Sequence, residues 1–216
     1  PYGADSIAGL LLESGYKPSD RLTAVIDLKQ PEEALWNNLK GETRSQVRQG
    51  SKLGVEVVEI TDSSGLEAFH ACMVSVSERT GMKLPVLEFF RCLLDSLAPG
   101  EMVRIYLAKH QGGVIGCALV LCHRGTVVTR YWGAYHESFK LRPYHVLIWR
   151  IILEAKRRGC HTCDFGGMPL DENNGIYKFK KGWGVRIERI DWYIKPLGYG
   201  RLLQRVNRLL SGRRTQ

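Results

Sequence analysis

The sequence lacks several features that would define its class at once. No apolar run approaches the roughly 20 residues of a membrane span, no signal peptide is visible, and no segment repeats or is of low complexity. The six cysteines are scattered, and the one close pair, Cys160 and Cys163, has no second CxxC or CxxH partner. The missing partner argues against a zinc ribbon. The mostly hydrophobic neighbours of the cysteines favour buried free thiols in a reducing cytoplasm.

The composition is that of an ordinary globular protein. The 216 residues are 44% hydrophobic and 25% charged, which suits one domain or one domain with an appended element. The chain begins at Pro1 without a methionine, and we expect residues upstream. The net charge of +9 favours a polyanionic partner such as tRNA, a nucleotide-linked substrate or an anionic membrane surface, although a basic but unspecialised enzyme has the same balance.

Hydrophobic periodicity predicts alternating helices and strands. Tight turns at residues 110–113 and 123–125 join three of the strands into an antiparallel meander. We expect helices over residues 6–14, from Pro31 through Trp36, and over 42–53, 66–79, 86–97 and 144–158, with a terminal helix beginning near Tyr199. We expect strands over residues 21–28, 55–60, 102–109, 114–122, 126–135, 160–165 and 185–194.

The most informative segment begins at the end of the strand over residues 160–165. Asp164-Phe165-Gly166-Gly167 ends a buried strand in two glycines, where backbone amides can approach a ligand. Aromatic residues then alternate with lysines from Gly175 to Gly184, and a strand over this segment would put Lys178 and Lys180 on one face. A cation beside a glycine-rich turn suits an acyl-transfer site, where it stabilises a developing oxyanion.

These motifs resemble those of the Fem-type peptidoglycan aminoacyltransferases, a branch of the GNAT acyltransferase superfamily. The specific part is Phe-Lys-Lys-Gly-Trp-Gly at residues 179–184, within the longer matching segment 175–184. Weaker matches lie at residues 36–57, at Arg79 and at Tyr131-Trp132-Gly133-Ala134, so the resemblance covers most of the chain.

The resemblance implies an α/β (α+β) GNAT-like fold, a mixed and mainly antiparallel sheet flanked by helices, corresponding to the second GNAT-like half of such enzymes. We expect an N-terminal segment over residues 1–60 that joins a missing upstream half. The acyltransferase domain is expected over residues 61–196, and a basic amphipathic helix over residues 197–216.

By resemblance, Lys180 stabilises charge beside the transferred acyl group, Phe179 packs against it, and Gly166 and Gly167 approach the substrate. An exposed lysine on an edge strand is the structural alternative for Lys180. The resemblance also maps Arg79 onto an arginine that grips a phosphate of the acceptor. An arginine at a helix C-terminus is explained equally by the helix dipole.

Two further candidates are less specific. Asp164 could act as general base for the incoming amine, or cap the turn that follows its strand. Tyr131 matches the family pattern for a residue that binds the acceptor, and Tyr135 is expected on the same side of its strand; core packing is the alternative for both.

Two basic stripes could meet a polyanion. Lys40, Arg44, Arg48 and Lys52 recur every four residues, and we take Arg44 and Arg48 as candidates for nucleic-acid binding, with a solvated helix face as the alternative. The arginines from 201 to 214 form the second stripe, which could lie on anionic lipid, contact tRNA or dock onto an upstream domain.

One further absence bears on the acyl donor. GNAT enzymes that use acetyl-CoA usually cradle its pyrophosphate in a glycine-rich loop, whereas residues 136–144 contain no glycine. This absence argues for an acyl donor other than CoA. The Fem-type resemblance implies transfer from aminoacyl-tRNA to an amine of a lipid-linked or nucleotide-linked cell-wall precursor. No metal or tightly held cofactor is expected, and the location is the cytoplasm or the inner face of the membrane. The alternatives are N-acyl transfer from acyl-CoA or acyl-carrier protein, and a catalytically silent half that only binds a partner.

Overall fold

A computed structural model describes residues 4–60 and 65–195 of the chain. The described residues fall into two compact units, one within residues 22–188 and one that combines residues 4–21 with residues 189–195. The helices are α1 (Ala4–Glu13), α2 (Glu32–Asn38), α3 (Gly41–Lys52), α4 (Leu66–Thr80), α5 (Leu87–Leu97), the 3-10 helix η2 (His136–Leu141), α6 (Pro143–Arg157) and α7 (Gly175–Lys181). The strands are β1 (Lys17–Asp27), β2 (Glu56–Ile60), β3 (Val103–His110), β4 (Gly113–His123), β5 (Thr126–Ala134), β6 (Thr162–Met168) and β7 (Arg186–Ile194).

The strands form one sheet in the order β2-β3-β4-β5-β6-β1-β7. Pairing is antiparallel from β2 through β5 and between β6 and β1, whereas β5 and β6 are parallel. The predicted mixed, mainly antiparallel sheet flanked by helices is therefore confirmed. The helix expected from Tyr199 lies outside the described residues.

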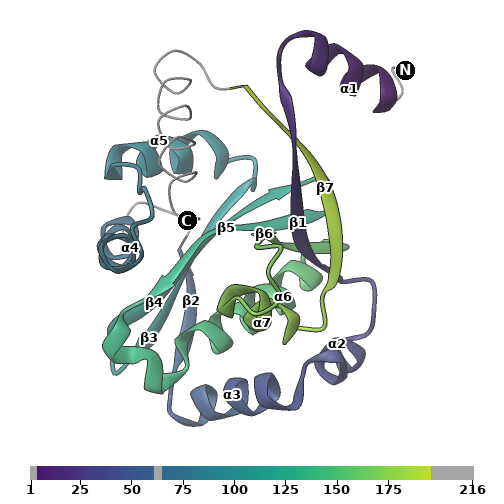
Figure 1. Cartoon of the computed structure of the whole chain (residues 1–216). Coiled ribbons are helices and arrows are strands. Elements are labelled where there is room, and N and C mark those ends of the chain that lie inside the picture. Colours follow the sequence, from purple (N-terminus) through teal and green to yellow (C-terminus); the bar gives the residue numbers. More distant parts are fainter. Residues whose placement is uncertain (1–3, 61–64, 196–216) are drawn as a thin grey trace, which may run out of the picture. The chain divides into compact units, whose positions relative to one another are not determined.

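In the unit of residues 22–188, helices cover both faces of the sheet (Figure 1). α4 and α5 pack on one face through residues such as Phe69 and Phe90, against Ile105 and Leu119 of the meander. α2, α3 and α6 contribute to the core on the other face, in which Ile151 is fully buried. Residues 22–60, which the sequence assigned to an N-terminal segment, share this second core with β3 to β6.

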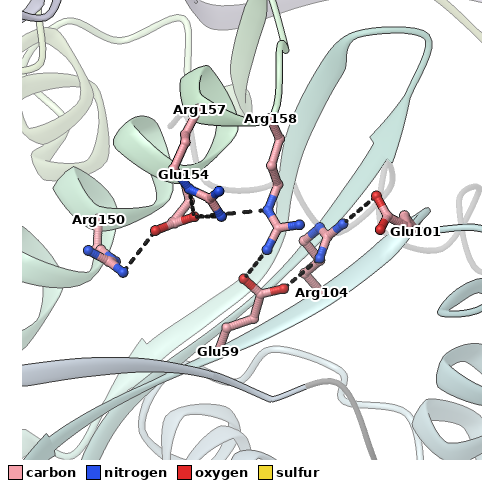
Figure 2. A network of polar contacts seen from close by, with 7 residues as sticks. All are labelled: Glu59, Glu101, Arg104, Arg150, Glu154, Arg157 and Arg158. Carbon is pink, nitrogen blue, oxygen red and sulfur yellow. Dashed lines mark hydrogen bonds and ion pairs between the residues drawn. The ribbon is translucent and has the colours of Figure 1, made fainter.

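An ion-pair network holds the C-terminal end of α6 to the outer strands (Figure 2). Glu59 of β2 accepts from Arg104 of β3 at 2.6 Å and from Arg158 at 2.9 Å, while Glu154 of α6 pairs with Arg150 and Arg157, each at 2.8 Å. Because the Arg104 side chain is largely buried, this pair is screened little by salt. The network fixes α6, whose opposite end reaches the candidate site.

No helix within residues 4–60 and 65–195 combines the length and the apolar character that crossing a membrane requires.

Candidate active site

A cavity in the unit of residues 22–188 lies between β5 and β6, where the two strands separate. The two strands pair only from Thr126 to Val128 of β5, so their later residues diverge. Ligands in sheets with parallel pairs commonly bind where strands separate beyond their carboxyl ends. The cavity has a volume of about 490 Å³ and is lined by Val76, Arg79, Thr80, Met82, Trp132, Tyr144, Gly167, Gly175, Ile176, Phe179 and Lys180.

The segment that carries Lys180 is the helix α7, and not the strand that its alternation of aromatic residues and lysines would suggest. α7 begins with the side chain of Asn174 accepting a hydrogen bond from the backbone N–H of Ile176 at 2.8 Å, a standard N-cap. The Tyr177 ring is buried, and its hydroxyl donates to Glu172 at 2.8 Å. On this helix, Phe179 and Lys180 both reach the cavity, which no strand would allow because neighbouring side chains on a strand face opposite ways.

Lys180 is buried rather than exposed. Only 3% of the residue is accessible, and its ammonium donates to the backbone carbonyls of Phe165, Gly166 and Gly167 at 2.6, 3.0 and 2.9 Å. An ammonium has three N–H donors, and all three are used here. Burial lowers the pKa of Lys180 to about 8, while the charge of Asp164 opposes that shift. The ammonium is therefore held at a fixed point in the cavity wall and is charged at neutral pH.

Asp164 has the capping role that the sequence left open. Its Oδ1 accepts from the hydroxyl of Thr23 on β1 and from the backbone N–H of Gly166 at 2.7 Å. Gly166 has a φ of +72°, in the left-handed region that glycine tolerates. Asp164 does not line the cavity, whereas Gly167 does. The carboxylate thus shapes the strand end, and the geometry gives it no contact with a ligand in this cavity.

Arg79 enters the cavity from the end of α4. Its guanidinium lies 4.9 Å from the ring centre of Phe139, and one N–H donates to the carbonyl of Ala134 at 3.3 Å. These two contacts fix the guanidinium on a different element from Lys180. The cavity therefore carries two cations, and none of its lining residues is an aspartate or glutamate.

Tyr131 does not line the cavity, because a β-bulge reverses the faces of β5. Leu119 and Val120 of β4 are adjacent, but they oppose Tyr131 and Thr129, so Arg130 is an extra residue. Tyr131 consequently packs into the core beneath α4 and α5, with its ring 5.1 Å from that of Phe90. The bulge turns the next residue, Trp132, to the cavity instead.

Sequence reasoning missed Trp132 and Tyr144 as cavity residues. Tyr144 is in the first turn of α6, and its ring is 5.7 Å from Trp132, 5.6 Å from Phe139 and 6.4 Å from Phe179. The Phe179 ring also meets the half-buried His145, at 5.5 Å. Burial and the charge of Arg142 lower the pKa of His145 to about 4, so its ring is neutral. The signal for this aromatic cluster was the density of aromatic residues between 131 and 145.

The Gly182-Trp183-Gly184 motif is explained by packing between chain segments. A Cβ on Gly182 would lie 2.6 Å from Oγ1 of Thr43, and one on Gly184 would lie 2.7 Å from the Asn38 carbonyl oxygen. Gly184 also has a φ of +68°. These glycines let the end of α7 approach the α2–α3 junction closely.

The basic stripe of α3 divides into two kinds of residue. Arg44 donates to the carbonyls of Asn37 and Leu39 at 2.9 and 2.6 Å, which caps the end of α2. Arg48 is exposed, and its guanidinium lies 5.2 Å from the ring centre of Trp36. Lys40 and Lys52 are exposed too. The position of Arg44 thus gives it a structural role, while the other three cations face solvent.

Comparison with known proteins establishes the family. The sequence profile described as acetyltransferase (GNAT) domain matches residues 37–181. The chain belongs to this family. This confirms the predicted GNAT-like fold and the predicted class of enzyme, an acyltransferase.

Individual relatives agree with the motifs. The chain is 20% identical to a lipid II:glycine glycyltransferase of Staphylococcus haemolyticus (strain JCSC1435), over 76% of this chain. It spans 56% of the length of that relative. A crystal structure of FemX superposes with a TM-score of 0.74 at 18% identity, covering 94% of this chain and 71% of that one. L-PGS from Bacillus licheniformis gives a TM-score of 0.64 at 13% identity, covering 97% and 71%. The similarity to Fem-type proteins is confirmed. At 18% and 13% identity, the two structures support the fold alone.

Proposed function

We propose that the protein moves an amino acid from aminoacyl-tRNA to an amine of a peptidoglycan precursor, in the cavity between β5 and β6. The observation that carries this proposal is that one cavity gathers Arg79, Phe179 and Lys180, three of the residues which the Fem resemblance selects. The matched relative is named a lipid II:glycine glycyltransferase, which supports a cell-wall acceptor. The acceptor is a lipid-linked or nucleotide-linked precursor, and a lipid-linked one would be met at an anionic membrane surface.

In this reaction the neutral amine attacks the ester carbonyl of the donor. The new C–N bond forms as the carbonyl oxygen gains negative charge, and the C–O bond to the tRNA ribose then breaks. The proton lost by the amine ends on the ribose oxygen that leaves. Because no carboxylate lines the cavity, we assign this proton transfer to the reactants and water.

Lys180 stabilises the oxyanion through its fixed positive charge. The three carbonyls that hold the ammonium orient it before the reaction begins, so no reorganisation is needed as charge develops. Arg79, on α4, retains N–H donors for an anionic group of the acceptor. The two cations thus have separate tasks, on the transferred group and on the acceptor.

The packing of α3 argues for a donor other than CoA. A Cβ on Gly50 of α3 would lie 2.5 Å from Val146 and 3.0 Å from the carbonyl oxygen of Leu141, so α3 covers the junction of η2 and α6. Pro143, at the start of α6, has no backbone N–H to offer a phosphate. The N-terminus of α6, where a pyrophosphate could otherwise bind, is therefore covered by α3.

For tRNA, we propose contact with the exposed cations of α3. Lys40, Arg48 and Lys52 face solvent, and the Trp36 ring beside Arg48 offers a stacking surface. Arg44 is not included, because its N–H groups cap α2.

A transfer assay with two donors tests the proposal. The protein is incubated with a cell-wall precursor and either tRNA charged with an isotope-labelled amino acid or labelled acetyl-CoA. Mass spectrometry then shows which label reaches the precursor. We expect the aminoacyl label on a precursor amine. Transfer from acetyl-CoA alone would support a CoA-dependent N-acyltransferase, and no transfer from either donor would support a half that only binds a partner.

A further inference from the structure

Tyr144 is the one residue of the aromatic cluster with a hydroxyl group, and it belongs to none of the sequence motifs described above. Tyr144 lines the cavity, and the rings of Trp132, Phe139 and Phe179 pack around it at centroid distances of 5.7, 5.6 and 6.4 Å. Edge-on and tilted packing of this kind fixes the plane of a ring. The packing of the cluster therefore fixes the direction in which the Tyr144 hydroxyl points.

The phenol of Tyr144 is close enough to the guanidinium of Arg79 for the Arg79 charge to lower its pKa. Both side chains pack on the ring of Phe139 and both line the cavity. Burial raises the pKa of Tyr144, and the nearby Arg79 charge offsets this only in part, so the phenol stays protonated and can donate. Arg79 uses one N–H for the Ala134 carbonyl, and a guanidinium carries five.

We infer that Tyr144 and Arg79 form a paired donor site for an oxyanion, either a phosphate or a carboxylate, and that Tyr144 sets the affinity for this group of the acceptor. A cation and a neutral O–H that converge on one oxyanion bind it more tightly than the cation alone. The inference deepens the proposed function, because cell-wall precursors carry both phosphates and carboxylates. It gives to Tyr144 the acceptor-binding role that the sequence had suggested for Tyr131.

Binding of small anions tests the pair without requiring activity. Inorganic phosphate, pyrophosphate and acetate are titrated into the parent protein and into Tyr144→Phe, Arg79→Met, the double variant and Tyr131→Phe, with NMR or calorimetry as the readout. Phenylalanine keeps the ring packing, and melting curves verify the fold of each variant. We expect Tyr144→Phe to weaken the preferred anion at least ~10-fold, the scale of one hydrogen bond to a charged group. The Tyr144→Phe effect should shrink when Arg79 is already replaced, as coupled residues do.

The arms of the experiment separate the possible outcomes. Preference for phosphate and pyrophosphate over acetate identifies a phosphate site, and the reverse identifies a carboxylate site. Unchanged binding by Tyr144→Phe, or equal loss in Tyr131→Phe, would overturn the inference, as would no saturable binding of any probe by the parent.

A kinetic arm separates this inference from the proposed function. If transfer occurs, Tyr144→Phe should raise the KM for the acceptor while kcat at saturation stays within a few-fold. If the parent transfers nothing, the proposed function fails, while the anion titrations still decide the role of Tyr144.

Discussion

Replacing Lys180 by methionine removes the ammonium while keeping a side chain of similar length and volume. Loss of one group that stabilises an oxyanion slows acyl transfer by ~100-fold or more. We therefore expect kcat for aminoacyl transfer to fall by at least ~100-fold in Lys180→Met. The exposed neighbour Lys178 is the matched control, and Lys178→Met should leave kcat within a few-fold of the parent.

Because Lys180 is buried, its replacement also changes the free energy of unfolding. Replacing a lysine on an exposed strand would change it little. The carbonyls of Phe165, Gly166 and Gly167 lose their donors, at about 1–3 kcal/mol for each one that water cannot reach. The variant no longer buries a charged ammonium, which stabilises its folded state by about 3 kcal/mol, the equivalent of the pKa shift from 10.5 to about 8. We expect a net loss of about 2 kcal/mol, or a fall in Tm of roughly 4–8 °C for a domain of this size.

The assay is single-turnover transfer at a temperature well below the Tm of the variant, so that chemistry and unfolding are separated. An arginine at position 180 tests the charge, because it keeps the cation at every accessible pH. If Lys180→Met retains kcat within a few-fold of the parent while its Tm falls, the ammonium has a structural role only, and the oxyanion assignment is wrong.

The pH dependence has a defined sign. Deprotonation of Lys180 removes the cation, so kcat of the parent should fall as pH rises through about 8. Stability responds in the opposite direction: the folded pKa lies below the ordinary value of 10.5, so the unfolded state binds more protons between these values. The free energy of unfolding of the parent, relative to Lys180→Met, should therefore rise from about pH 8 to pH 10.5, measured by denaturant titration. A flat difference across this range would contradict a depressed pKa.

Three further predictions test the packing and the partners. Gly184→Ala places a Cβ against the Asn38 carbonyl at a φ of +68°, so it should destabilise the fold by at least ~2 kcal/mol in denaturant titration, and a stability equal to the parent would refute the contact. Replacing Arg48 and Lys52 by glutamine should flatten the salt dependence of tRNA binding, whereas Arg44→Gln should lower Tm without changing that slope; equal slopes in all variants would remove α3 from the interface. Acetyl-CoA at millimolar concentration should leave the Tm unchanged, and a shift equivalent to ~2.7 kcal/mol, expected at 100 times Kd, would establish a CoA site.

The order of helices and strands was predictable because their hydrophobic periodicities are regular and their turns contain glycine. One exception is α7, in which aromatic residues and lysines alternate from Tyr177 to Lys180, as they would on a strand. Two contacts stabilise the helix instead: the Asn174 cap, and the hydrogen bonds that Lys180 donates to backbone carbonyls at the end of β6. The second of these belongs to a distant segment, and local sequence cannot reveal it.

The sequence predicted those cavity residues that belong to a motif. It did not predict those that reach the cavity only through the tertiary structure. Lys180, Phe179 and Arg79 carried motifs and do line one cavity. Trp132 reaches that cavity through the bulge at Arg130, an irregularity that shifts the faces of β5 and leaves no sign in the alternation of residues. The neighbours of Tyr144 come from three other elements, so only the folded chain brings them together.

The most direct test of the central claim is a crystal structure of the protein with a non-reactive donor analogue, an amino acid joined by an amide to the 3′ end of a short RNA. The amide replaces the ester and cannot be transferred, while its carbonyl occupies the reactive position. The account predicts that the aminoacyl group lies in the cavity between β5 and β6, with its carbonyl oxygen facing Lys180 and the RNA leading out toward α3. An aminoacyl group bound elsewhere, with this cavity empty, would contradict the account.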